Sequence, residues 1–483
     1  MLKRRHPVLL PLALGVVVHV CVPISVYQRH GSVDAFAFRS LDSREYFQIA
    51  ANLAARGVFS QQTAPPFEPD TWRTPGYPLF LAFFIRLCGE SPAVLVNVQQ
   101  LLSVLNVWLV FRIAGWFMNE RRAAVAALLF LFEPYHLFYS LWLMAETLFV
   151  TVVLLAWLAW LRAADAGRWP WHALAGALSG AAVLIRPVAV LVPAALLVGL
   201  LLAARRRRVA EGPLRWSKWW PGPAAFTVSC GLLIGAWMSR NAVVAGQFAF
   251  SDQSGVVLAY FKATEVVLWR DGRTEDRYLE TSLDPARVND PHRVWEDIDT
   301  RLGEAFAHAS ESDRAALRWP NLAQGNRTGL DSFDVSRALG RIGWSYLTEV
   351  PLSTLACCLT RSGAVLTFPL ELALRPPAGV PQRRLRSLML AAPYLFLAAA
   401  VLVRLLRGNM RFDATYLPLA CTAALLLATT PQIDPRFRVP MIPLLIVFAL
   451  LPATRRRPDA RQRQRTVPGN AGAGGATRPG GPS

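Results

Sequence analysis

The 483-residue sequence lacks the segments that many soluble enzymes use to bind nucleotides, and it has few residues that could hold a metal. No glycine-rich phosphate-binding loop is present. The six cysteines form no C-x-x-C pair, the seven histidines are dispersed, and Asp and Glu number 32 against 51 Lys and Arg. We therefore expect no metal centre and no bound nucleotide, although a divalent cation held by carboxylates stays an alternative.

Apolar residues are abundant and form long blocks. They make up 53% of the chain, with a mean hydropathy of +0.31, which is more than one soluble core could bury. The blocks are about 17–25 residues long, the length that crosses a hydrocarbon layer of ~30 Å. We predict an all-α polytopic membrane protein with about ten transmembrane helices, external interfacial helices and one sizeable external loop region. The blocks lie near 8–26, 92–116, 122–140, 142–162, 172–185, 187–204, 222–239, 387–405, 412–430 and 437–453.

The net charge of +19 follows the membrane pattern rather than a nucleic-acid-binding one, because the basic residues lie in short segments between the apolar blocks. With ten alternating helices, both termini are expected in the cytoplasm. Residues 241–350, which hold about half of the acidic residues, are then external. The basic segment Arg383-Arg384-Arg386 does not fit this topology, and an additional span at 355–372 would reverse everything after it.

Four regions follow from these patterns. Residues 1–240 are predicted to form an N-terminal membrane module whose first external loop, 27–91, is catalytic. Residues 241–386 form the external region with an interfacial helix, and 387–454 return as transmembrane helices. The remainder, 455–483, is basic and rich in Gly and Pro, which predicts a disordered cytoplasmic tail.

Ionisable residues gather at the predicted external ends of the helices, where a charge is costly unless it serves a site. Asp42 and Tyr46 share one face of a short helix after the first span. Arg73 precedes Thr-Pro-Gly-Tyr-Pro, a turn that restricts its direction. A guanidinium group there suits a phosphate, since it can bind two phosphate oxygens at once. Anchoring to lipid headgroups is the competing interpretation.

Further charges lie at the starts and ends of later spans. Glu146 begins a span and is flanked by Leu, Met and Phe, and Arg240 with Asn241 ends the seventh. Arg436 and Arg438 lie at the start of the last span, where positive charge opposes the helix dipole, so they are expected to bind an anion.

These segments resemble, in their order along the chain, those of the C-type membrane glycosyltransferases. That group includes protein O-mannosyltransferases, the aminoarabinose transferase of lipid A and lipopolysaccharide sugar transferases. The chain departs from it where many relatives have a consecutive Asp-Glu pair, because Ser43 follows Asp42. The similar segments are Asp42-x-x-x-Tyr46, Arg73-Thr-Pro-Gly-Tyr-Pro, Glu146, Leu-Ile-Arg186-Pro, Trp237-x-x-Arg240-Asn241 and Arg436-Phe-Arg-Val-Pro-x-x-Pro.

The resemblance implies a plasma-membrane glycosyltransferase that takes a hexose or pentose from a polyprenyl-phosphate donor. The acceptor would be an envelope lipid, glycan or protein on the external face, with membrane lipids and no nucleic acid as partners. Asp42 is the expected catalytic base, with Glu146 second. The donor phosphate would contact Arg73, Arg438, Arg436 and Arg240, and the pocket would be supported by Tyr46, Tyr77 and Asn241.

Two other functions compete with this interpretation. A transporter or flippase for a lipid-linked or anionic substrate would also have many helices and a basic cavity. Its ionisable residues are expected near the middle of the bilayer, whereas those of this sequence gather at one face. A non-catalytic subunit of envelope assembly is the second alternative.

Overall fold

The computed structural model describes residues 7–211, 220–271, 293–319, 330–367, 394–403, 406, 420–425, 429, 436 and 438–451. Every regular element within these ranges is a helix, which confirms the prediction of an all-α protein. The predicted basic tail, the arginines at 383–386 and most of the predicted span 412–430 lie outside the described residues.

Five described helical segments are long and apolar enough to cross a membrane, and they coincide with five of the predicted blocks. The protein is therefore a multi-pass membrane protein. The segments are α1 (Leu9–His30), α5 (Pro92–Phe117), α8 (Glu146–Ala166), the 3₁₀ turn η1 (Pro187–Leu191) with α10 (Val192–Glu211), and α12 (Pro221–Ala245).

Two predicted spans are wrong in their extent. The block 122–140 is two helices, α6 (Glu120–Leu131) and α7 (Pro134–Tyr139), because Pro134 has no backbone N–H and the Glu133 carboxylate accepts the His136 N–H to begin a new helix. In the described part of the last block, 438–451, the only regular helix is the nine-residue α23 (Ile442–Leu450). Among the described residues, the ten full spans of the prediction are thus not reproduced.

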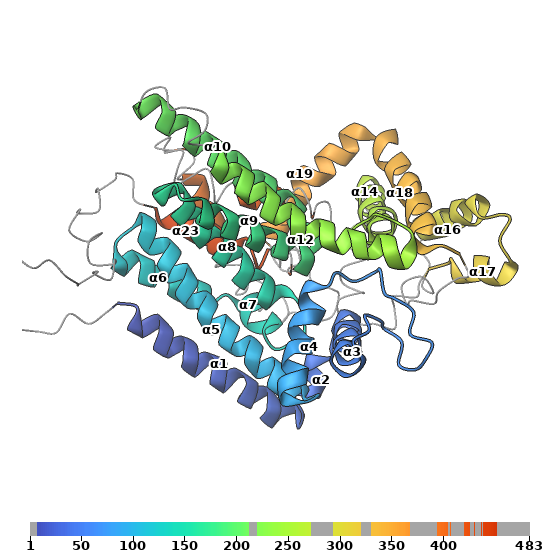
Figure 1. Ribbon diagram of the computed structural model, residues 1–483, viewed down its shortest axis with the longest axis horizontal. Coiled ribbons are helices and arrows are strands. Elements are labelled where there is room, and N and C mark those ends of the chain that lie inside the picture. The colour runs from blue at the N-terminus through green and yellow to red at the C-terminus, as the bar shows by residue number, and fades with distance from the viewer. Residues whose placement is uncertain are drawn as a thin grey trace, which may run out of the picture. The chain divides into compact units, whose positions relative to one another are not determined.

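α8 packs between α5 and α9 (Trp169–Ile185), and its Trp157 is 1% exposed. The α9 helix also packs closely against α12 (Figure 1). The close approach is possible because Gly176 and Gly180 of α9 have no side chains at this contact. A Cβ atom at Gly176 would lie 2.1 Å from the Phe226 carbonyl oxygen. Small residues four apart let two membrane helices approach each other in this way.

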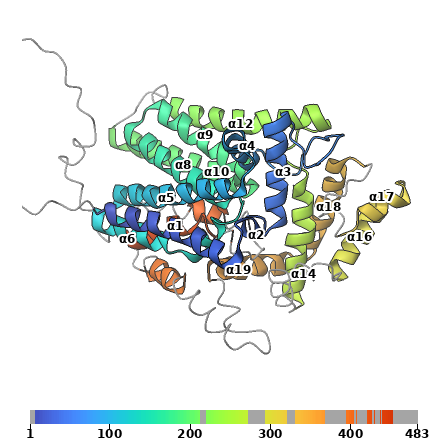
Figure 2. The same cartoon turned by 90° about the horizontal axis from the view of Figure 1, so that it is seen from below.

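Three short helices follow α1: α2 (Asp34–Ala37), α3 (Leu41–Arg56) and α4 (Gly76–Cys88). α3 packs on α4 and runs across the direction of α5, α8 and α12 (Figure 2). One face of α4 is buried, whereas Leu79, Phe83 and Leu87 on the other are more than half exposed. An exposed apolar face of this kind is typical of a helix that lies in the membrane interface.

Most of the region 241–367 has a separate apolar core, to which Tyr260, Trp295 and Leu339 contribute. Trp72 of the first loop packs against this core. A buried ion pair of 3.1 Å joins Glu265 to Arg361 at the last helix. The elements are α13 (Gln253–Val256), the π-helical η2 (Val257–Ala263), α14 (Thr264–Arg270), α16 (Arg293–Ala305), α17 (Glu311–Ala316), α18 (Ser332–Glu349) and α19 (Pro351–Thr367).

Candidate active site

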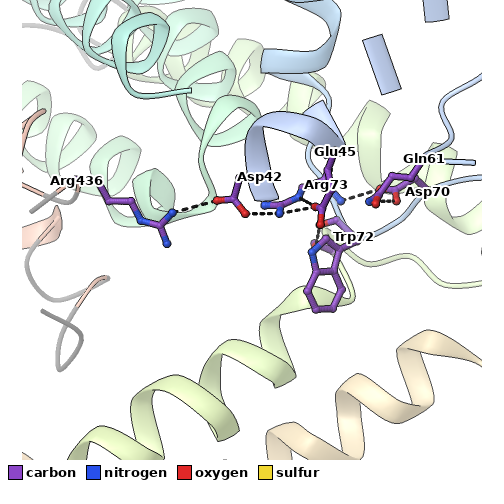
Figure 3. Close-up of polar contacts among 8 residues, drawn as sticks. Asp42, Glu45, Gln61, Asp70, Trp72, Arg73 and Arg436 are labelled. Carbon is purple, nitrogen blue, oxygen red and sulfur yellow. Dashed lines mark hydrogen bonds and ion pairs between the residues drawn. The ribbon is translucent and has the colours of Figure 1, made fainter. Parts of the chain in front are cut away.

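Asp42 lies in the first turn of α3 and binds two arginines from distant parts of the chain. Its Oδ1 atom lies 2.5 Å from an Nη atom of Arg73, and its Oδ2 atom lies 3.0 Å from an Nη atom of Arg436 (Figure 3). Its two carboxylate oxygens therefore each contact one guanidinium group. The structure thus brings together three of the residues predicted for the site.

Glu45 is a member of this cluster that the sequence analysis missed. It lies one helical turn after Asp42, and its Oε2 atom accepts a hydrogen bond of 2.6 Å from Nε of Arg73. Arg73 thus lies between two carboxylates of α3 (Figure 3). The i, i+3 spacing of Asp42 and Glu45 is the sequence signal that could have identified it, since residues so spaced share a helix face.

The backbone of Arg73 is also held in place. Its N–H donates to Oδ1 of Asp70 over 2.8 Å, and the other oxygen of Asp70 accepts a 2.6 Å hydrogen bond from Gln61. The guanidinium group lies 5.0 Å from the ring centre of Tyr46, and the residue is only 7% exposed. Arg73 is therefore fixed by its surroundings rather than extended toward lipid headgroups.

The two carboxylates of α3 differ in their proton affinity. Burial raises the pKa of Asp42, but Arg73 and Arg436 lower it by more, so its pKa lies well below the ordinary value. Burial also raises the pKa of Glu45; Arg73 opposes this and the charge of Asp42 adds to it, so the pKa stays above its ordinary value. On lowering the pH, Glu45 is thus the first of the two to take up a proton.

Glu146 forms a second ion pair, with Arg186 at the end of α9. Both residues are largely buried, and Arg186 is close enough to lower the pKa of Asp42. The turn after Arg73 packs tightly on this end of α9. A Cβ atom at Gly76 would lie 2.6 Å from a side-chain carbon of Ile185 and 2.9 Å from its backbone nitrogen.

Arg240 and Asn241 lie at the end of α12 and hold loops. Arg240 donates a 2.6 Å hydrogen bond to the carbonyl oxygen of Asp70, the residue that binds the Arg73 backbone. Its guanidinium group also lies 4.8 Å from the ring centre of Trp237. Asn241 donates to the carbonyl oxygen of Ala249 over 2.9 Å. Both residues thus support the loop segments next to the cluster.

The two tyrosines predicted as pocket supports contact each other. The rings of Tyr46 and Tyr77 are perpendicular, with centres 5.0 Å apart, and the Tyr77 hydroxyl donates a 2.6 Å hydrogen bond to Gln99 of α5. They connect α3, α4 and α5 next to Arg73.

Arg438 has a different environment from Arg436. It is fully buried, with its guanidinium carbon 3.7 Å from the ring centre of Tyr394 and 4.5 Å from that of Tyr135. The structure therefore does not place its side chain in the cluster around Asp42.

No group of three metal-binding side chains occurs among the described residues. The region after α12 does contain an Asp-x-Asp sequence, Asp297 and Asp299, a pattern associated with nucleotide-sugar enzymes. Both carboxylates accept hydrogen bonds from tyrosine hydroxyls of the same region, Asp297 from Tyr346 and Asp299 from Tyr260. They serve the packing of α16 against its neighbours.

Comparison with known proteins adds a family match to this geometry. Residues 72–217 match the family described as dolichyl-phosphate-mannose-protein mannosyltransferase. This segment is thus similar to a family of membrane-bound sugar transferases. The resemblance predicted from the sequence is confirmed over this part of the chain, which contains Arg73, Glu146 and Arg186. Asp42 and Arg436 lie outside the matched segment, and their ion pairs connect them to it.

Two crystal structures of ArnT from Cupriavidus metallidurans align with this protein, and each alignment covers 90% of this chain and 77% of the ArnT chain. The structure bound to undecaprenyl phosphate has a TM-score of 0.38 and 16% sequence identity. The apo structure has a TM-score of 0.36 and 15% identity. No curated protein sequence matches the chain.

Proposed function

We propose that this protein moves a sugar from a polyprenyl-phosphate donor to an envelope acceptor on the external face of the plasma membrane. The observation that carries the proposal is the approach of Arg73, from the matched segment, and Arg436, from the far end of the chain, to the carboxylates of α3. The family match supports a donor of this class, since the family's description names a dolichyl-phosphate sugar.

In this proposal the donor phosphate binds where the arginines meet. Arg436 is the more accessible of the two, with 28% of its side chain exposed against 8% for Arg73. A phosphate that displaces the carboxylate contacts gains two planar donors, and these stabilise the charge that grows on the leaving phosphate. Arg240 supports this site indirectly, through its hydrogen bond to the carbonyl oxygen of Asp70 in the loop before Arg73.

The carboxylates of α3 face the same place, so one of them accepts the proton of the acceptor hydroxyl. The acceptor oxygen bonds to the anomeric carbon while the bond from that carbon to the phosphate oxygen breaks, and the electron pair leaves with the lipid phosphate. Asp42 is our first assignment for this base. Glu146, which is bound to Arg186, supports the site from α8.

A transfer assay with purified protein tests the proposal. The protein in detergent receives a radiolabelled polyprenyl-phosphate hexose or pentose together with membranes from a strain that lacks it. Label should pass to the acceptor fraction, and an Asp42→Asn variant of equal abundance is the control. If label crosses the bilayer of reconstituted vesicles and never changes carrier, the protein is a transporter instead. Mass spectrometry of envelope glycans from the same strain would identify the acceptor.

A further inference from the structure

Arg438 is a buried cation at a position where charge is unfavourable. It precedes α23, and its carbonyl oxygen accepts the N–H groups of Met441 and Ile442 at the start of that helix. Positive charge at a helix start opposes the helix dipole, and full burial removes its hydration. Something else in this part of the structure must therefore compensate for the charge.

The compensation comes from three residues of two other segments. Tyr135 of α7 and Tyr394 of the helix Tyr394–Val403 present their rings to the guanidinium group. The Tyr394 hydroxyl donates a hydrogen bond to Glu133, whose charge interacts with that of Arg438. We call Glu133, Tyr135, Tyr394 and Arg438 the Arg438 anchor.

The anchor fixes the chain two residues away from Arg436. Arg438 is fully buried, whereas Arg436 keeps 28% of its side chain exposed and reaches Asp42 over 3.0 Å. Two arginines of one short turn thus have separate environments, one inside the anchor and one at the cluster.

We propose that the Arg438 anchor positions Arg436 at the donor site, so that Arg438 acts through Arg436 and does not itself bind the phosphate. The guanidinium group of Arg438 lies over the rings of Tyr135 and Tyr394. A lysine ammonium group would bind these rings less well than the planar guanidinium group does. The role of the anchor in donor use rests on the proposed function, but its effect on the Asp42–Arg436 pair does not.

The first test is a kinetic double-mutant cycle. Tyr394→Phe removes one hydroxyl and keeps the ring, and it should raise the KM for the polyprenyl-phosphate sugar several-fold with little change in kcat. Because the anchor acts through Arg436, the double variant Tyr394→Phe/Arg436→Gln should be no worse than Arg436→Gln alone. Tyr260→Phe is the matched control, since Tyr260 is a buried tyrosine that donates to Asp299 in the separate core. It should leave the donor KM unchanged.

The second test needs no substrate, so it separates failure of the anchor from failure of the proposed function. Thermal unfolding midpoints are measured for Asp42→Asn, Tyr394→Phe and the double variant in detergent. A double variant that loses less than the sum of the two single losses supports the anchor. Glu133→Gln serves in place of Tyr394→Phe if that variant does not fold. Additive losses in the unfolding cycle would overturn the proposal, as would an unchanged donor KM in Tyr394→Phe.

Discussion

Arg436 lies 3.0 Å from Asp42 although 394 positions separate them along the chain. The pair joins α3 to the turn before the last described helix, and Arg73 binds the other oxygen of the same carboxylate. The Asp42 carboxylate thus holds both guanidinium groups close to each other, where the proposed function places the donor phosphate. The cluster is thus assembled from distant parts of the chain, with Asp42 as the common partner.

Asp42→Asn should leave insertion and abundance intact and lower sugar transfer about 100-fold or more, because it removes both a base and the partner of two arginines. Transfer by the purified variant is compared with that of wild type at equal protein. Turnover near the wild-type rate would remove Asp42 from the mechanism and leave Glu45 as the carboxylate to examine.

The pH dependence of transfer should follow Glu45. Its pKa is raised and that of Asp42 is lowered, so Glu45 is the first to become protonated as the pH falls, and protonation weakens its bond to Arg73. We expect kcat/KM for the donor to decline on the acid side in wild type. In Glu45→Gln this decline should move to lower pH. An unchanged acid limb in that variant would assign it to another group.

Lysine should not replace either arginine of the cluster. Arg73 binds two carboxylates through a planar fork, and an ammonium group cannot reproduce that geometry. Arg73→Lys and Arg436→Lys should each lower transfer, with the loss appearing in the KM for the donor more than in that for the acceptor. Wild-type kinetics in both variants would instead favour the lipid-anchoring interpretation.

The Glu146–Arg186 pair should matter for stability as well as for transfer. Glu146→Gln removes the carboxylate that binds the largely buried Arg186, and breaking a buried pair in this way costs about 3–5 kcal/mol. The thermal unfolding midpoint in detergent should therefore fall, and transfer with it. Glu146→Gln/Arg186→Gln should recover part of the midpoint. A double variant as unstable as the sum of the two would mean that the residues act independently.

The predicted topology can be tested by labelling single cysteines in a cysteine-free background. Glu311→Cys, in the region expected outside, should react in intact cells with a membrane-impermeant maleimide. Glu120→Cys, between α5 and α6, should react only after the cells are opened. Both positions are exposed in the structure, so accessibility within the protein does not distinguish them. Reaction at 120 in intact cells would reverse the orientation.

Helix class and most helix positions could be predicted because they depend on local sequence. The apolar blocks correspond to α1, α5, α8 and α12 to within a few residues. The break inside 122–140 was missed although Pro134 indicated it, because apolar residues on both sides masked the end of the helix.

The membership of the cluster could be predicted only in part. Asp42 and Arg73 could be predicted because each belongs to a short sequence motif. The role of Glu45 could not, because it depends on how the loop after α3 folds back and brings Arg73 against that helix. The same is true of Arg436 and Arg438, which look equivalent in the sequence. Their different burial is decided by Tyr394 and Glu133, which lie far from them along the chain.

The close contact at Gly76 sets the spacing between the two ion pairs of the site. Arg73 lies shortly before Gly76, and Arg186 directly follows Ile185, the residue against which Gly76 packs. A Cβ atom at position 76 would lie 2.9 Å from backbone atoms of Leu184 and Ile185, so a side chain there would push the two segments apart. Glycine at position 76 therefore keeps the turn after Arg73 and the end of α9 that precedes Arg186 at their present separation.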